Sequence, residues 1–183
     1  MSAPELSILI CTLPERGAVL QRLQQMLQRQ MARQPVEMIF DRTGPHMTVG
    51  AKRNALLSRA SGRYVAFIDD DDTVHPSYVG LVLDRLKFNP DCVELRGTMT
   101  TNGTNPKQFI HTIHCTHWHE KDGVYWRMPN HLNPIRRELA VQAGFPEKSF
   151  GEDHEFSQRV QPLLKTQAEL PISIYNYLYR TRK

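Results

Sequence analysis

The segment Tyr64-Val65-Ala66-Phe67-Ile68-Asp69-Asp70-Asp71-Asp72, residues 64–72, carries the strongest structural signal in the chain. Its apolar residues form a continuous run, which predicts a strand covered on both faces, as in a parallel sheet. Four aspartates follow directly at the carboxyl end of that strand. Carboxylates gathered at one site repel one another, so a divalent cation held by Asp69 and Asp71 is one interpretation, and a solvated acidic turn is the other.

The residues around this strand alternate between strand and helix patterns. Apolar runs predict strands at 6–11, 36–40 and 92–95, and apolar residues at three- and four-residue steps predict helices at about 19–33, 48–60 and 76–88. This alternation predicts an α/β fold, a Rossmann-like and mostly parallel sheet with helices on both faces. Ligands of such sheets bind outside the carboxyl ends of the strands, where Thr12, Asp41 and residues 69–72 fall.

The second half of the chain has a different pattern. It predicts a strand at 108–118, a helix at 135–143, a helix from Glu152 that stops at Pro162, and a closing strand at 172–179. No repeat or linker separates the halves. We therefore expect one domain over residues 1–183.

Composition narrows the class of protein. The chain has 183 residues, 40% of them hydrophobic and 23% charged, as in ordinary globular proteins. Its apolar runs are far shorter than the roughly 20 residues of a membrane-spanning helix, and residues 1–5 show no secretory signal, so a cytoplasmic location is expected. Three cysteines without paired spacing argue against a disulfide framework. The net charge of +4 permits an anionic partner without selecting one.

Several segments together resemble family 2 glycosyltransferases, inverting enzymes of the GT-A fold. Residues 67–72 resemble the family's Asp-x-Asp-Asp element, and other segments match in the family's order: residues 7–12, 50–54, 133–137, 144–145, 151–153 and 177–180. The resemblance covers nearly the whole chain. It implies a small, phage- or bacterial-like enzyme in which residues 1–98 bind a nucleotide-sugar and residues 99–183 bind the acceptor and supply the catalytic base.

The resemblance also implies a donor and a cofactor. The donor would be a UDP-sugar, with Mn²⁺ or Mg²⁺ at Asp69 and Asp71. Donor contacts would come from Thr12, Pro14, Arg16, Asp41, Lys52, Arg53, Asn54, Asp69 and Asp70. The amino end of the helix that carries Lys52 and Arg53 can receive phosphate, and a solvated helix face is the alternative. Residues 40–44 lack the serine and second acidic residue usual in the family, which leaves the donor's base open.

Asp153 is the predicted general base, and Glu152 would position it. In the reaction that the resemblance implies, Asp153 accepts the proton of an acceptor hydroxyl during a single displacement with inversion, while the cation neutralises the departing diphosphate. The alternative is that the acidic residues at 152–155 only stabilise a helix amino terminus.

A histidine-rich run lies within the strand predicted at 108–118 and just beyond it. Alternation along a strand would put His111, Cys115, His117 and His119 on one face, which allows a zinc site, although the paired short loops of structural zinc sites are missing. Acceptor contacts and plain packing are the alternatives, for His114 as well. His131 is a candidate metal ligand or acceptor contact.

The acceptor is the least determined part of the prediction. Tyr175, Tyr177 and Tyr179 share one strand face beside Arg180, Arg182 and Lys183, a mixture of rings and positive charge that is typical of nucleic-acid surfaces. One hypothesis is therefore a hydroxymethylated pyrimidine in DNA, modified in the host cytoplasm if the protein is phage-encoded. Glycan, lipid and protein hydroxyls are other acceptors. A nucleotidyltransferase and a non-catalytic nucleotide-sugar-binding module are the alternative functions.

Overall fold

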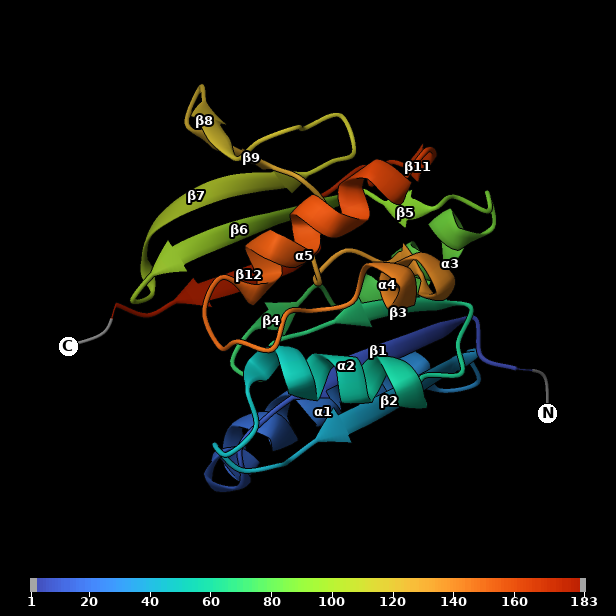
Figure 1. Ribbon diagram of the computed structural model, residues 1–183, viewed down its shortest axis with the longest axis vertical. Coiled ribbons are helices and arrows are strands. Elements are labelled where there is room, and N and C mark those ends of the chain that lie inside the picture. Colours follow the sequence, from blue (N-terminus) through green and yellow to red (C-terminus); the bar gives the residue numbers. More distant parts are fainter. Residues whose placement is uncertain (1–2, 182–183) are drawn as a thin grey trace.

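The computed structural model describes residues 3–181, which form two six-stranded sheets and five α-helices (Figure 1). The first sheet has the order β11 (Gln167–Ala168), β5 (Cys92–Val93), β10 (Ile135–Arg136), β3 (Tyr64–Phe67), β1 (Leu6–Cys11), β2 (Val36–Asp41). The second has the order β4 (Thr73–Val74), β12 (Tyr175–Tyr179), β6 (Leu95–Thr101), β7 (Thr104–His111), β9 (Val124–Arg127), β8 (His119–Lys121). The helices are α1 (Gly17–Met31), α2 (Val49–Arg59), α3 (Tyr78–Leu86), α4 (Arg137–Ala143) and α5 (Glu152–Val160).

The centre of the first sheet confirms the predicted α/β fold. Strand β1 pairs in parallel with β2 on one side and with β3 on the other. The carboxyl ends of these three strands therefore meet at one edge, which brings together the segments that follow Cys11, Asp41 and Phe67. The edge of the sheet beyond β3 is mixed, because β10 pairs antiparallel to both β3 and β5.

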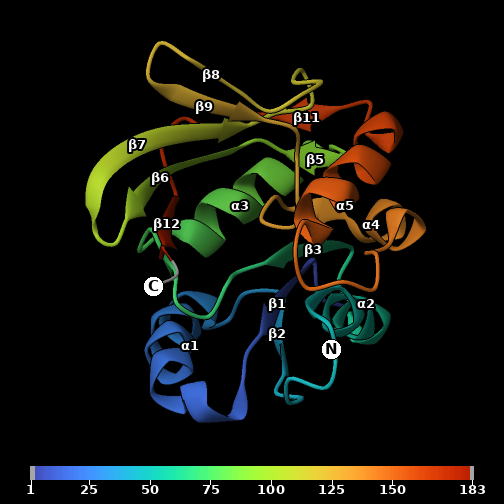
Figure 2. The same cartoon turned by 60° about the vertical axis from the view of Figure 1, so that its left-hand side comes forward.

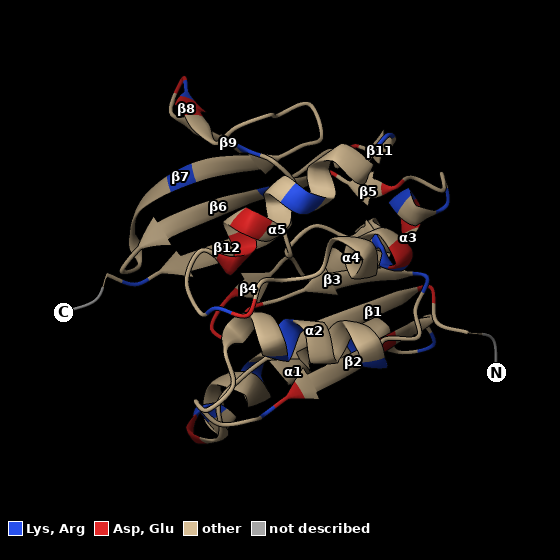
Figure 3. Ribbon diagram, viewed as in Figure 1, with Lys and Arg blue, Asp and Glu red and all other residues tan. Residues whose placement is uncertain are grey.

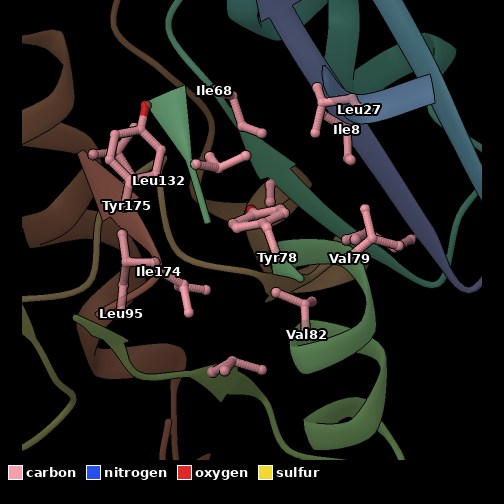
Figure 4. Packing of buried hydrophobic residues seen from close by; sticks show 14 of the residues in the cluster. Ile8, Leu27, Ile68, Tyr78, Val79, Val82, Leu95, Leu132, Ile174 and Tyr175 are labelled. Carbon is pink, nitrogen blue, oxygen red and sulfur yellow. The ribbon is translucent and has the colours of Figure 1, made fainter. Parts of the chain in front are cut away.

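Alternation along the central strands separates two hydrophobic clusters. Ile8 and Ile10 of β1 point into a cluster with α1 and α3, whereas Leu9 points into a cluster with α2, α4 and α5. Figure 2 shows these two groups of helices on opposite sides of the first sheet. In the first cluster, Tyr78, Val79 and Val82 of α3 pack between the two sheets (Figure 4). A strand that is covered on both faces needs a continuous apolar run, which is the pattern that predicted it.

The structure corrects several predicted boundaries in the second half. The strand predicted at 108–118 ends at His111, because the chain turns there: the Cys115 amide donates to the Thr112 carbonyl at 3.1 Å. The helix predicted from residue 135 begins at Arg137, since Ile135 and Arg136 form β10. The closing strand begins at Tyr175 rather than at residue 172.

Two boundaries near the acidic turn also differ from the prediction. Helix α3 begins at Tyr78, so Pro76 lies in the turn before it and not in its first turn. The strand predicted at 92–95 divides between the sheets, with β5 ending at Val93 and β6 beginning at Leu95. The chain passes from the first sheet to the second at this point.

No helix within residues 3–181 combines the length and the apolar character needed to cross a membrane.

Candidate active site

A cleft of about 840 Å³ lies at the carboxyl ends of β1 and β3. The acidic turn after β3 lines the cleft, together with basic side chains from other elements. The lining residues predicted from sequence are Thr12, Arg16, Lys52, Arg53, Asp69, Asp70, Asp71 and Glu152. Figure 3 shows the acidic turn and the acidic first turn of α5 on the same side of the molecule. The predicted ligand-binding edge of the sheet is therefore a cleft of mixed charge.

Two arginines and a threonine hold the acidic turn. The Thr12 hydroxyl donates to Asp70 Oδ2 at 2.5 Å, and Arg16 Nη2 lies 3.0 Å from Asp70 Oδ1 and 2.9 Å from Asp71 Oδ2. Arg180 Nε lies 3.9 Å from the same oxygen of Asp71. Burial raises the pKa of Asp70, and the bond from Thr12 and the charge of Arg16 oppose this shift. The turn thus presents Asp71 to the cleft, where a quarter of its side chain is exposed.

Asp72, the last aspartate of the run, connects the two sheets. Its Oδ2 accepts a hydrogen bond from the Tyr175 hydroxyl at 2.8 Å, and its Oδ1 accepts one from the Leu178 amide at 2.8 Å. Burial raises the pKa of Asp72 to about 8, with a further contribution from Asp69. Because both oxygens are engaged, Asp72 positions β12 against the acidic turn.

Arg53 connects Asp69 to the segment that carries the predicted base. Its Nη2 lies 3.3 Å from Asp69 Oδ1 and 3.6 Å from Glu152 Oε1. The guanidinium is also 5.4 Å from the Phe67 ring centroid and is only 5% exposed. Burial acts to raise the pKa of Asp69, but His131, followed by Arg53 and Arg16, outweighs burial and holds this pKa well below its usual range. Arg53 therefore links Asp69 to the first residue of α5.

A smaller cavity of about 250 Å³ opens beside the cleft, between α5 and the second sheet. Asp69, Arg53 and Glu152 line both spaces, while Asp153 lines the smaller one. Gly151 precedes α5 with φ of 69°, a left-handed conformation that favours glycine. This turn starts α5 so that its first two residues reach the cavities. The acidic turn and Asp153 therefore belong to one continuous site.

Three predicted donor contacts do not line the cleft: Pro14, Asp41 and Asn54. Pro14 lies in the short 3-10 turn Pro14–Arg16 that presents Arg16. Asp41 is buried and accepts hydrogen bonds from the amide and the hydroxyl of Thr43. Asn54 bonds both backbone groups of Phe145, with Nδ2 2.9 Å from the carbonyl oxygen and Oδ1 2.8 Å from the amide.

At the amino terminus of α2, which the sequence suggested could receive phosphate, the protein itself satisfies the first four amides. The Gly50 amide donates to the Lys148 carbonyl at 3.0 Å, and the Val49 amide lies 3.3 Å from Ser149 Oγ. The next two amides bond to Thr48, which caps the helix. Lys52 directs its Nζ to the Thr43 carbonyl and still borders the cleft.

The histidines do not share one face, so the arrangement expected for a zinc site is wrong. His111 is buried in the smaller cavity, with Nδ1 3.2 Å from Asn133 Oδ1. His114, Cys115, His117 and His119 border a separate pocket beyond the strand's end. Among residues 3–181, no three His, Cys, Asp or Glu side chains form a group able to hold a metal ion. His131 lies in the smaller cavity, and its Nε2 is 3.6 Å from Asp69 Oδ2.

Two of the three tyrosines at the carboxyl end border the site, and one of these two, Tyr179, is also 45% exposed. Tyr175 is 1% exposed, Tyr177 borders both cavities, and Tyr179 reaches the cleft. Burial raises the pKa of Tyr177 to about 12, and the charges of Asp69 and Asp72 add to the shift. Arg180 joins the acidic turn, while Arg182 and Lys183 lie outside the described residues.

Three residues that line the smaller cavity were not predicted from the sequence: Tyr125, Arg127 and Phe150. Tyr125 and Arg127 alternate along β9 and therefore share a face, a signal that becomes readable only once residues 124–127 are assigned as a strand. Phe150 is 66% exposed and borders both the cavity and the cleft.

Comparison with solved structures identifies the fold. A structure of S. aureus TarS, residues 1–349, in complex with UDP-GlcNAc superposes with a TM-score of 0.70 and 14% identity, covering 98% of this chain and 60% of that one. The complex of TarS 1–349 with UDP gives 0.66 and 15%, covering 95% and 60%. A longer TarS structure gives 0.65 and 14%, covering 95% and 36%. The chain thus has the GT-A fold and spans at most 60% of the length of these proteins.

Comparison with sequence families points the same way. A search of curated proteins found no match. The family model described as "Glycosyl transferase family 2", however, matches residues 17–163. This stretch runs from the first residue of α1 through α5 and includes the acidic turn and Asp153. This chain therefore belongs to glycosyl transferase family 2.

Proposed function

We propose that this chain is an inverting glycosyltransferase that moves a sugar from a nucleotide diphosphate donor to an acceptor hydroxyl. One observation carries the proposal: Asp69 borders both the cleft and the smaller cavity, and Asp153 borders the cavity. A donor whose diphosphate lies in the cleft would then direct its sugar towards Asp153. The two halves of the chain divide accordingly, with most cleft residues in 1–98 and most cavity residues in 99–183.

The reaction is a single displacement. The acceptor oxygen bonds to the anomeric carbon, the bond from that carbon to the diphosphate breaks, and the hydroxyl proton passes to Asp153. A positioned general base of this kind contributes typically 10²–10⁴-fold. Within residues 3–181, no cation lies at ion-pair distance from Asp153, so its carboxylate is available to accept the proton. Glu152 is held by Arg53 and fixes the start of α5.

Mn²⁺ or Mg²⁺ fits the chemistry of the acidic turn. Asp69 and Asp71 supply carboxylate oxygens to the same cleft, and hard cations prefer oxygen ligands. Since two carboxylates make an incomplete ligand set, diphosphate oxygens and water would complete it. When bound, the ion would neutralise charge on the departing diphosphate. Arg16 and Arg180, already at Asp71, would share that role.

A UDP-sugar is the proposed donor, because TarS was solved with UDP-GlcNAc and with UDP. Hydroxymethylated pyrimidine in DNA remains among the acceptors to be tested, with glycan, lipid and protein hydroxyls. For an enzyme that uses UDP-sugars, the cytoplasm is the proposed location.

The proposal is tested by incubating the protein with nucleotide-sugars and Mn²⁺ or Mg²⁺ and measuring the nucleotide product. Slow donor hydrolysis that releases a nucleoside diphosphate and free sugar is expected. Release of a nucleoside monophosphate would indicate nucleotidyl chemistry instead. Donor binding by calorimetry without turnover on any acceptor would indicate a non-catalytic module. Acceptor assays should compare hydroxymethylated with unmodified DNA, and equal inactivity on both would remove the DNA hypothesis.

A further inference from the structure

Arg127 is a charged residue of the smaller cavity that forms no ion pair within residues 3–181. Its guanidinium carbon lies 4.4 Å from the Trp118 ring centroid and 5.4 Å from that of Tyr125. Within residues 3–181, no carboxylate lies within ion-pair distance of this guanidinium, and no protein acceptor receives a hydrogen bond from it. Stacking on rings uses the faces of a guanidinium and leaves its in-plane N–H groups available to a ligand.

The other arginine of the cavity shows what is missing around Arg127. Arg53 has two carboxylates within 3.6 Å, those of Asp69 and Glu152. Arg127 is half-buried without such compensation, and burial lowers its pKa while the charge of Asp153 opposes the shift. A desolvated cation is costly unless it is paired, so a ligand anion is the group that would compensate it.

Asp153 and Arg127 give the cavity two separated, opposite charges. Both line the same space of about 250 Å³, and no side-chain nitrogen of Arg127 lies within 4.0 Å of a carboxylate oxygen of Asp153. Pockets for small ligands usually measure about 300–1,000 Å³, so this space suits a single unit of sugar size. Such a unit can place a hydroxyl at Asp153 and a negative group at Arg127.

The position of Arg127 assigns that negative group to the acceptor rather than to the donor. Arg127 belongs to β9 in the second sheet and does not border the cleft. The donor's diphosphate has its own cations in the cleft, which are Arg16, Lys52 and Arg180.

We infer that the acceptor is an acidic compound, whose carboxylate or phosphate pairs with Arg127 while its hydroxyl faces Asp153. This inference rests on the proposed glycosyl transfer and names the chemical class of its acceptor. Charge-assisted hydrogen bonds with paired geometry, as arginine makes with carboxylate and phosphate, would fix the acceptor's orientation as well as its affinity.

The test uses matched acceptors: a panel of neutral hexoses, the corresponding uronic acids and the corresponding hexose 6-phosphates. With a donor that the protein hydrolyses, the wild type should use one acidic series with a kcat/KM about 10- to 100-fold above that of the neutral series. The carboxylate and phosphate arms distinguish the two anions. Arg127→Gln should lower kcat/KM for the acidic series by that same factor, so that the preference over the neutral series is lost. Arg22→Gln, which removes the same charge from the exposed face of α1, should keep it.

Two results would overturn the inference. One is equal use of neutral and acidic acceptors by the wild type. The other is an equal loss on both series in Arg127→Gln, which would mean that Arg127 only positions Asp153. If no donor is hydrolysed, the proposed function fails, independently of the acceptor's charge. Saturation-transfer NMR of the same sugars, with UDP present, then measures whether the protein binds the acidic sugars. Acid binding that depends on Arg127 supports the inference, and no acid binding refutes it.

Discussion

The Gly50 amide donates a 3.0 Å hydrogen bond to the Lys148 carbonyl, which links helix α2, at the edge of the cleft, to the segment that leads into Glu152 and Asp153. The approach is so close that a Cβ on Gly50 would lie 1.8 Å from the Pro146 carbonyl oxygen. Asn54, one turn later, bonds both backbone groups of Phe145. Helix α2 therefore holds residues 145–148, which lead into the segment that carries Glu152 and Asp153.

Gly50→Ala is expected to displace residues 145–149 and with them the start of α5. Because the obstacle is backbone, the strain cannot be relieved by a side-chain rotation, and stability should fall by about 1–3 kcal/mol. The kcat should fall because Asp153 is displaced. The KM for the donor should change less, because the cleft is less affected. The matched control is Gly80→Ala in α3, where no atom lies within 4 Å of the added Cβ. It should stabilise the protein by up to about 1 kcal/mol. Similar effects of the two substitutions in urea unfolding would contradict this account.

Arg53→Met is expected to destabilise the protein by about 3 kcal/mol, because removal of one member of a buried charge pair leaves an uncompensated charge. Here Glu152, which is 9% exposed at its side chain, would lose its cation. Met retains much of the contact with Phe67 and Phe145, so charge is the main variable. Arg59→Met, at an exposed position on the same helix, should change stability by less than about 1 kcal/mol. Equal losses of unfolding free energy would show that Arg53 is not a structural cation.

Stability should fall in mild acid because burial disfavours the charged form of His111. Burial, with a contribution from Arg127, lowers the pKa of His111 to about 3, against 6.5 for the ordinary group. Between these values the unfolded chain binds more protons, so stability is lost as pH falls below 6.5, at up to about 1.4 kcal/mol per pH unit for one proton. His111→Gln should flatten the curve of unfolding free energy between pH 6.5 and 4.5. The exposed control His46→Gln should leave the slope unchanged, and an unchanged slope in both variants would be evidence against the prediction.

Asp71→Asn should weaken Mn²⁺ binding at least about tenfold, since even residues outside the ligand set can cost 10–100-fold. The free-ion signal in electron paramagnetic resonance, with UDP present, measures binding independently of turnover. Asp122→Asn is the control, because this exposed residue has φ of 53°, a conformation that asparagine also accepts. Wild-type Mn²⁺ affinity in Asp71→Asn would remove Asp71 from the cation site.

The first sheet was predictable because each of its central strands is a run of apolar residues that can be recognised without knowing its neighbours in the sheet. The run at β3 is apolar at every position and the run at β1 at every position except Ser7, and both strands are buried on both faces, so composition and burial agree. The acidic residues after β3 could be placed at a sheet edge for the same reason. Pairing across the chain was not readable in the same way. Among the two-residue strands, β5 falls within the run predicted at 92–95, whereas β4, β10 and β11 are too short to carry a pattern of their own.

The run from Thr112 to Trp118 shows why the second sheet was harder to predict. It alternates like a strand, yet its backbone bonds are taken by nearby side chains: the Thr112 hydroxyl accepts from the His114 amide at 3.4 Å and donates to Gln167 at 3.1 Å. Side chains of this type compete with sheet pairing. Arg127 could not be predicted as a cavity residue from the sequence, because only the fold places it against the Trp118 ring and in the same cavity as Asp153.

The central claim is that Asp153 accepts the proton of the acceptor hydroxyl while the donor lies in the adjoining cleft. The direct measurement compares Asp153→Asn with the wild type, using calorimetry for donor binding, starting with UDP-GlcNAc and UDP, and a labelled-sugar assay for transfer. The account predicts donor affinity within about twofold and a loss of transfer of about 10²–10⁴-fold. Wild-type rates of transfer in Asp153→Asn would contradict it.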